Sequence, residues 1–365
     1  QEADAIAIGY AAGQLNQNAY AVAIGSAAGQ DGQYANAIAI GNLAGNSGQQ
    51  SYAVAIGRLT GETSQGNSSV AIGDESGKTS QRTLAVAIGN NAGQLTQNAY
   101  SVAIGHTAGQ SGQYESAVAF GREAGRRNQE THGIAIGSYA GVSNQKFASI
   151  GIGHAAGNDG QNAYAIAIGY DSAKDGQLTG AVAIGWDAGG SSQGGNSVAI
   201  GSDAGRYGQD GASIAIGLNA ASNNQSGSSI AIGNSAGRFD QGINAIAIGR
   251  SAGYSNQNGG GNGIAIGWEA AYQNQEDNSI AIGTDAGRES QGANSIAIGK
   301  EAGKSNQGDN SIILNATGEE FSPTGDGAFH VKPIRSFDNF PTFNPLSWNS
   351  VTGEVFLNTA KTFVI

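Results

Sequence analysis

Cysteine and methionine are both absent from this 365-residue sequence, and proline occurs only four times. Without cysteine, the chain can form no disulfide framework and offers no thiolate for catalysis or metal binding. All four prolines lie at or after Pro323, which argues against a proline-rich linker earlier in the chain. No run of about 18 apolar residues occurs, so we expect no insertion into a membrane.

Charge is also scarce: charged residues make up 12% of the chain, and the formal net charge is −11. A nucleic-acid-binding protein needs clustered Lys and Arg to neutralise phosphates, and no such stripe is present. We therefore expect no nucleic-acid partner. An acidic, self-repelling surface is typical of a soluble extracellular protein. Because Gln1 lies within a repeat, we expect the chain to be a processed piece of a longer product.

Catalytic and metal-binding patterns are missing as well. The four histidines are scattered, and the sequence contains neither a metal-ligand motif nor a nucleophile motif. Acidic residues such as Asp285 and Glu301 have basic residues three positions later, which predicts exposed ion pairs rather than a catalytic carboxylate pair. We therefore predict no enzymatic activity, no cofactor and no metal site.

Glycine, in contrast, is abundant at 61 residues, and it marks a strict internal repeat. The pentapeptide Ala5–Gly9 returns with its closing glycine sixteen residues later each time, up to Gly249. After a two-residue insertion between 257 and 263 the register resumes at Gly267, and Asn315 takes the last glycine position. Such a period predicts an all-β parallel β-solenoid (β-roll) of about twenty coils over residues 1–315. At the spacing of paired strands the rod is roughly 95 Å long.

One strand per coil is predicted by the alternating Ile/Val–Ala–Ile pattern before the closing glycine. A second glycine usually follows four residues later, and a glutamine stands eight residues after the closing glycine. The glutamines are Gln17, Gln33, Gln49, Gln65, Gln81, Gln97, Gln113, Gln129, Gln145 and Gln161, and the column continues to Gln307. Stacked identical amides predict a structural hydrogen-bonded ladder. The alternative is a polar binding stripe.

Small residues fill the positions two and four before each closing glycine. The first of these columns comprises Ala7, Ala23, Ala39, Ala55, Ala71, Ala87 and Ala103, and continues along the repeat. We expect the bulky Ile and Val side chains to fill the interior of the coil and this flat alanine face to be an oligomer interface. In the alternative arrangement, the small residues lie inside a thin coil and Ile/Val form the core between subunits. Both arrangements predict self-association, because so narrow a coil buries little by itself.

Aromatic side chains at predicted turns are candidate ligand contacts, chiefly Trp186, Trp268, Tyr20 and Tyr52. One interpretation is that they stack on sugar rings; local packing within the turns is the simpler one.

Residues 316–365 differ in composition, with all four prolines and many phenylalanines. Phe329–Arg335 reads as a strand, and Leu346–Asn349 with Glu354–Leu357 reads as a hairpin. We predict a small C-terminal β segment that caps the open edge of the last coil. Alternatively, the segment docks on the next subunit and builds an end-to-end filament.

Two units, Asn278–Gly283 and Asn294–Gly299, resemble the head repeats of trimeric autotransporter adhesins. The resemblance implies a left-handed β-roll that assembles as a trimer and binds host surfaces. The unit here is longer than is usual in that family, and the extra residues fall in the turn with glutamine. This longer form resembles fibre proteins of phages, large DNA viruses and bacterial surfaces. Ser311–Asn315, Phe329–Arg335 and Trp348–Val355 are similar to the segment that precedes an intramolecular chaperone domain in such fibres.

Together these features predict a non-enzymatic structural fibre or adhesin, located outside the cell at a cell surface or virion surface. Its main partner is expected to be itself, as a homotrimer and in one version as a filament. A surface glycan or host protein is a further expected partner. The alternative is a virion tail fibre that recognises a host-surface glycan.

Overall fold

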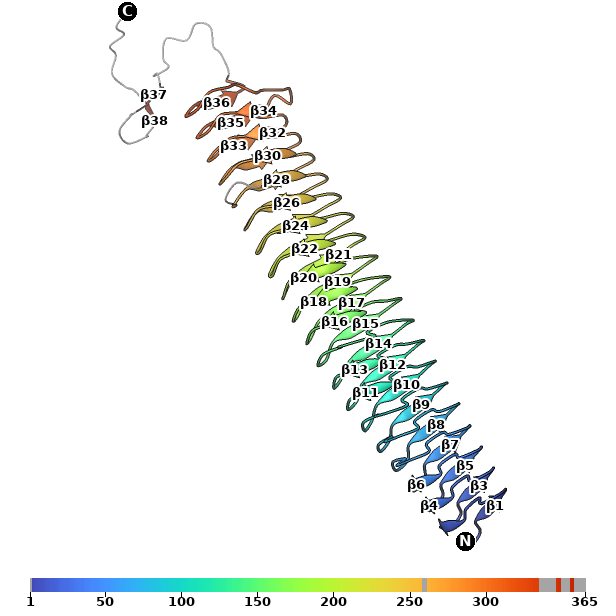
Figure 1. The fold of residues 1–365 in the computed structure, drawn as a ribbon. Helices are drawn as coiled ribbons and strands as arrows, with labels where there is room; N and C mark the ends of the chain where they lie inside the picture. Colours follow the sequence, from blue (N-terminus) through green and yellow to red (C-terminus); the bar gives the residue numbers. More distant parts are fainter. Residues whose placement is uncertain (1, 258–260, 335–345, 349–354, 358–365) are drawn as a thin grey trace, which may run out of the picture.

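The computed structural model describes residues 2–257, 261–334, 346–348 and 355–357. These residues contain strands and turns, and their coils stack into a straight rod with Ile6–Ile8 (β1) at one end and Phe329–Lys332 (β36) at the other (Figure 1). Successive coils pair in parallel, with each residue opposite the one sixteen positions later, as in Val182 opposite Val198. The predicted parallel β-solenoid of about twenty coils is confirmed.

The Ile/Val–Ala–Ile segments form one long parallel sheet of 21 strands. Its strands are β1 (Ile6–Ile8), β3 (Val22–Ile24), β5 (Ile38–Ile40), β7 (Val54–Ile56), β8 (Val70–Ile72), β9 (Val86–Ile88), β10 (Val102–Ile104), β12 (Val118–Phe120), β14 (Ile134–Ile136), β15 (Ile150–Ile152), β17 (Ile166–Ile168), β19 (Val182–Ile184), β21 (Val198–Ile200), β23 (Ile214–Ile216), β25 (Ile230–Ile232), β27 (Ile246–Ile248), β29 (Ile264–Ile266), β31 (Ile280–Ile282), β33 (Ile296–Ile298), β35 (Ile312–Asn315) and β36 (Phe329–Lys332). The two-residue insertion leaves the register intact, since Ile246 pairs with Ile264.

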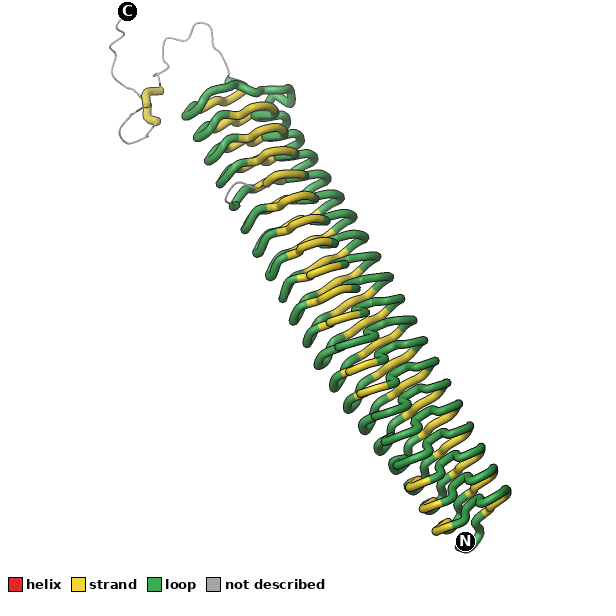
Figure 2. Tube along the Cα trace, viewed as in Figure 1, coloured by secondary structure: helices red, strands yellow, loops and turns green. Residues whose placement is uncertain are grey.

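A second strand ends at the glutamine of most coils, and the sequence did not predict it. These strands are β2 (Leu15–Gln17), β4 (Asp31–Gln33), β6 (Ser47–Gln49), β11 (Ser111–Gln113), β13 (Arg127–Gln129), β16 (Asp159–Gln161), β18 (Asp175–Gln177), β20 (Ser191–Gln193), β22 (Tyr207–Gln209), β24 (Asn223–Gln225), β26 (Phe239–Gln241), β28 (Ser255–Gln257), β30 (Gln273–Gln275), β32 (Glu289–Gln291) and β34 (Ser305–Gln307). Figure 2 shows them as a second row of strands, separated from the first by turns. Their middle residue, such as Asn16 with φ of 55°, adopts the left-handed conformation. The sequence of these strands therefore lacks the alternation of apolar and polar residues that usually predicts a strand.

The interior of the coil is built from small residues, so the predicted orientation of the main sheet is wrong. Ala23, Ala39, Ala55, Ala71, Ala87 and Ala103 are all fully buried. Ala7, in the first coil, occupies the same column and is exposed only there. The alanines three after each closing glycine, such as Ala188, pack against this column from the other side. The Ile and Val side chains point outward instead.

The physical reason is that the two strands of each coil lie too close together for Ile inside. One large side chain per coil enters the interior, and it is the glutamine: Gln177 and Gln193 are fully buried. A Cβ added at Gly189 would lie 2.7 Å from Oε1 of Gln193, so even alanine crowds that position. Overpacking of such an interior costs about 1–3 kcal/mol per site, which excludes Ile or Val from it.

The closing glycine is required by the stacking of coils. A Cβ added at Gly185 would lie 2.6 Å from the carbonyl oxygen of Gly201 in the next coil, and φ is +134°. We expect Gly185→Ala to lower the free energy of unfolding by more than about 2 kcal/mol, because both the backbone conformation and the contact are unfavourable. Gly176→Ala is the matched control, since φ is +74° but nothing lies within 4 Å. Thermal unfolding of both variants checks the prediction, and equal losses would contradict it.

The repeat ends where larger residues replace the standard ones. Ile313 is fully buried in the alanine column of the last coil, where no further glutamine follows, and Phe321 packs beside it. Asn315 fixes the following turn, with Nδ2 donating to the carbonyl of Lys300 at 2.8 Å and Oδ1 accepting from Thr317 Oγ1. β36 then adds one more parallel rung, which confirms a strand in the first four residues of the predicted range 329–335.

The predicted hairpin is present as an antiparallel pair of β37 (Leu346–Trp348) and β38 (Val355–Leu357). The rest of the segment 335–365 lies outside the described residues. Whether residues 316–365 cap the rod or dock on another subunit therefore stays a prediction.

Candidate functional site

The glutamine column forms the predicted ladder, inside the coil rather than on a surface. Nε2 of Gln177 donates to Oε1 of Gln193 at 3.0 Å, and its own Oε1 accepts from Gln161 at 3.1 Å. Nε2 also reaches the carbonyl of Ile166 at 2.8 Å, which ties the second strand to the first. Because the column is fully buried, a binding stripe for an external ligand is excluded there. The ladder includes each predicted member from Gln17 to Gln161.

The ladder is interrupted at two places. Oε1 of Gln257 and Oε1 of Gln307 have no hydrogen-bond partner, because the preceding glutamines do not donate to them. The first interruption lies beside the insertion at 257–263, and the second lies in the last repeat coils. The contact that spans the insertion is kept, since Nε2 of Gln257 donates to Oε1 of Gln275 at 2.7 Å.

The outward face of the long sheet is an apolar strip two side chains wide, made by the residues one and three before each closing glycine. We call it the Ile/Val strip. At the rod's end Ile6 and Ile8 are 48% and 58% exposed, and Phe120 in the middle is 52% exposed. Most other members are half-buried. At strand spacings the strip is roughly 90 Å long with about 7 Å between its columns.

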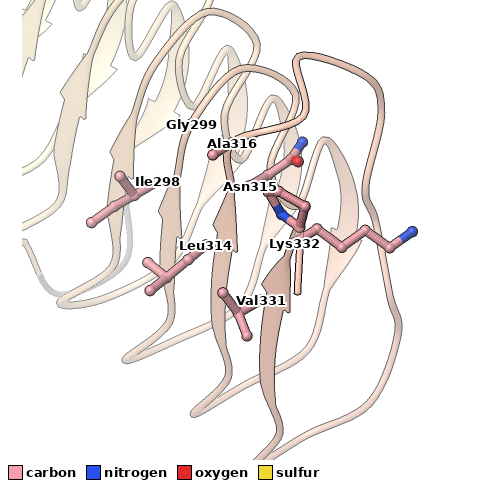
Figure 3. A pocket seen from close by; sticks show the side chains of 8 residues that line it. Ile298, Gly299, Leu314, Asn315, Ala316, Val331 and Lys332 are labelled. Carbon is pink, nitrogen blue, oxygen red and sulfur yellow. The ribbon is translucent and has the colours of Figure 1, made fainter. Parts of the chain in front are cut away.

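The strip continues past the last repeat into β36. Ile298, Leu314 and Val331 come from β33, β35 and β36, and their side chains lie on the same side of the sheet (Figure 3). They line a shallow pocket of about 470 Å³ together with Asn315 and Lys332. The amide of Asn315 is used within the turn, so the pocket offers little polar chemistry. We treat it as part of the Ile/Val strip.

The four aromatic residues singled out from the sequence are exposed, but the structure does not bring them together. Trp186 and Trp268 are 59% and 50% exposed, and both follow a closing glycine. They are five coils apart, roughly 24 Å at strand spacing. Tyr20 and Tyr52 are 60% and 61% exposed and lie in the other turn, two coils apart. Their role as ligand contacts stays a prediction.

Acid–base pairs three residues apart, as expected from the sequence for Asp285 and Glu301, form at five places in the turn after the closing glycine. They are Glu75–Lys78, Glu123–Arg126, Asp203–Arg206, Asp285–Arg288 and Glu301–Lys304. Between coils, Arg206 also contacts Asp187 at 2.6 Å. Burial raises the pKa of Asp187 above 3.8 despite the opposing charge of Arg206. Ionisation of Asp187 therefore opposes folding as the pH rises above 3.8, so its contact with Arg206 adds little to stability.

Chemistry beyond binding has little support within the described ranges. No group of three or more metal-ligating side chains occurs there, and no helix there is long and apolar enough to cross a membrane. Comparison with known protein families, with curated proteins and with solved structures finds no match. The Ile/Val strip is therefore the strongest candidate site, and the sequence had offered it only as the alternative arrangement.

Proposed function

We propose that this protein is a non-enzymatic structural fibre or adhesin outside the cell, which self-associates through the Ile/Val strip as a homotrimer. The observation that carries the proposal is the strip itself. Monomeric soluble proteins rarely expose a continuous apolar patch of more than a few hundred Å². Forty side chains in register along twenty coils form such a patch without interruption by charge.

The energetics favour covering the strip. Full burial of an Ile or Val side chain is worth about 1.5–3 kcal/mol, so covering its exposed part contributes roughly 1 kcal/mol. Summed over the rod, this exceeds the about 4–15 kcal/mol cost of association by a wide margin. The coil interior, which holds alanine and glutamine, has far less apolar surface to offer. Stability of the rod and self-association are therefore expected to be coupled.

Three copies fit the narrow strip, because two columns per chain can meet two neighbours around a central axis. The resemblance to trimeric autotransporter heads points to the same number, and it too remains a prediction. The straight rod and the lack of any catalytic cluster among the described residues are consistent with a spacer that projects from a surface. The alternative function, a virion tail fibre, would use the same assembly and differ in its source and ligand.

The test places charges on the strip. One variant combines Ile152→Glu, Ile168→Lys, Ile184→Glu and Ile200→Lys. Neighbouring coils of one chain then carry opposite charges and attract each other. Equivalent coils of different chains, aligned in register, carry like charges and repel each other. We expect sedimentation velocity to change from a trimer to a monomer. The matched control carries Leu178→Glu and Leu218→Lys, two exposed apolar residues off the strip, and should keep the trimer mass.

Circular dichroism on the same samples separates dissociation from unfolding. A charged-strip variant that keeps the parent's mass would contradict the proposal. Loss of the trimer in the control as well would show that general surface charge, rather than the strip, governs assembly.

A further inference from the structure

The turn after each glutamine carries aromatic residues in two parts of the rod: Tyr20, Tyr34 and Tyr52 in the first three coils, and a longer run in the middle. Five successive coils place one aromatic residue each in this turn, and we call the group the aromatic ridge. It consists of Tyr100, Tyr114, His132, Phe147 and Tyr164. All five are exposed, with Tyr100 at 56% and Tyr164 at 59%. At strand spacing, consecutive members are about 4.8 Å apart along the rod.

The ring arrangement is regular where the rings touch. The ring of Phe147 lies edge-to-face with His132 at 5.7 Å and with Tyr164 at 5.5 Å between centroids. Three consecutive coils thus present a row of touching rings along the rod axis, in which the plane of Phe147 is nearly perpendicular to those of His132 and Tyr164. Such rings offer an apolar face and, in tyrosine, a polar tip.

The fold does not need aromatics in this turn. From Leu178 onward the same turn contains no aromatic residue, yet the coils continue unchanged. There the turn ends in asparagines that bond to one another, as in Asn262 to Asn278 at 3.2 Å and Asn278 to Asn294 at 3.3 Å. A purely structural role therefore does not account for the ridge.

A polar pocket lies at the N-terminal end of the ridge. It has a volume of about 250 Å³ and is lined by Arg82, Asn98, Ala99, Tyr114, Glu115 and Thr131. Within the described residues, the side chains of Arg82, Asn98, Glu115 and Thr131 make no hydrogen bond or ion pair with other side chains. This contrasts with charges nearby, such as Lys146 with Glu130 at 3.0 Å and Arg126 with Glu123 at 3.0 Å. Unpaired donors and acceptors beside an aromatic ring are available to a polar ligand.

We infer that the aromatic ridge and this pocket bind a linear polysaccharide of equatorially linked (β-1,4) pyranose rings, lying parallel to the rod. The apolar C–H faces of such rings stack on aromatic rings, while their hydroxyl groups need both donors and acceptors at the edge. One aromatic per coil matches the length by which an extended chain of this kind advances per sugar. A guanidinium and a carboxylate together favour a neutral chain over a strongly charged one.

Other occupants fit less well. Nucleic acid is disfavoured by the net charge of −11. A second copy of the chain would cover the ridge with apolar groups and leave Arg82 and Glu115 desolvated without partners, which is costly. The inference deepens the proposed surface role but does not depend on self-association.

Isothermal titration calorimetry of the full chain with cellohexaose, mannohexaose (β-1,4-linked) and chitohexaose tests the inference, with α-linked maltohexaose as the comparison. We expect at least one β-linked hexasaccharide to bind at least tenfold more tightly than maltohexaose. Tyr114→Ala is expected to weaken that binding at least tenfold, and Arg82→Ala about fivefold. The matched control is Tyr207→Ala, which removes a tyrosine 44% exposed in the C-terminal half and should leave binding unchanged.

Absence of binding to every β-linked probe would overturn the inference. So would equal affinity for maltohexaose, or an equal loss in Tyr207→Ala. Sedimentation of the same samples reports assembly separately, so failure of glycan binding and failure of the proposed self-association are distinguishable.

Discussion

Replacing Gln177 with leucine is expected to lower the local free energy of unfolding by about 3–5 kcal/mol. The side chain is fully buried: the two hydrogens of Nε2 are shared among two carbonyl oxygens and Oε1 of Gln193, and its own Oε1 accepts from Gln161. Leucine removes all of these contacts and leaves Oε1 of Gln193 without a donor. A buried unpaired acceptor alone costs about 1–3 kcal/mol.

Gln307→Leu is the matched comparison within the same column. Gln307 is 3% exposed, but its Oε1 has no partner. Its Nε2 donates to the carbonyls of Ile296 and Ser311, and within the described residues its amide bonds to no other glutamine. We expect a loss of only about 1–2 kcal/mol there. Hydrogen exchange resolved along the chain measures both, because a stacked repeat opens locally. Equal losses would show that the amide–amide bonds of the ladder add nothing to stability.

The second large effect is expected from Ala183→Leu. Ala183 is fully buried between the two strands, and a Cβ placed at Gly189 would already lie 3.2 Å from its methyl group. Three additional carbon atoms have no space there. We therefore expect the free energy of unfolding to fall by about 1–3 kcal/mol or more, as is typical of overpacking, and the yield of folded protein to be low. The adjacent outward change Ile184→Leu should cost less than about 1.5 kcal/mol.

This pair of variants distinguishes the two faces of the sheet directly. If the alanine column were the outer surface, Ala183→Leu would be tolerated and Ile184→Leu would be the more damaging change. Thermal unfolding and soluble yield of both variants give the answer.

The architecture was predictable because a sixteen-residue period with Ile/Val–Ala–Ile strands leaves few alternatives to a solenoid. Which face points inward was not predictable from alternation. Alternation shows that the strand has two different faces, but it does not show which of them lies in the interior of the coil. The inward face is decided by how little space lies between the two strands of a coil, and by the burial of Gln177 in that space. One signal was present in the sequence: small residues at every interior position, such as Ala183 and Gly189, leave space for only one long side chain per coil.

The second strand and the aromatic ridge were missed for different reasons. The middle residue of the second strand is Gly, Asn, Ser or Asp in nearly every coil, which favours positive φ and resembles a turn in sequence. The members of the ridge occupy three different positions of one turn, as at Tyr100, Tyr114 and Phe147. A comparison of equivalent positions in successive repeats therefore does not group them together. Stacking of whole turns in three dimensions is what places them in one row.

The mass of the unaltered, folded chain in solution tests the central claim most directly. Sedimentation equilibrium over a wide range of dilution should report three copies of the 36.5 kDa chain, with circular dichroism confirming β structure throughout. A single folded chain at every concentration would contradict the account, because the Ile/Val strip would then be stable in water without a partner.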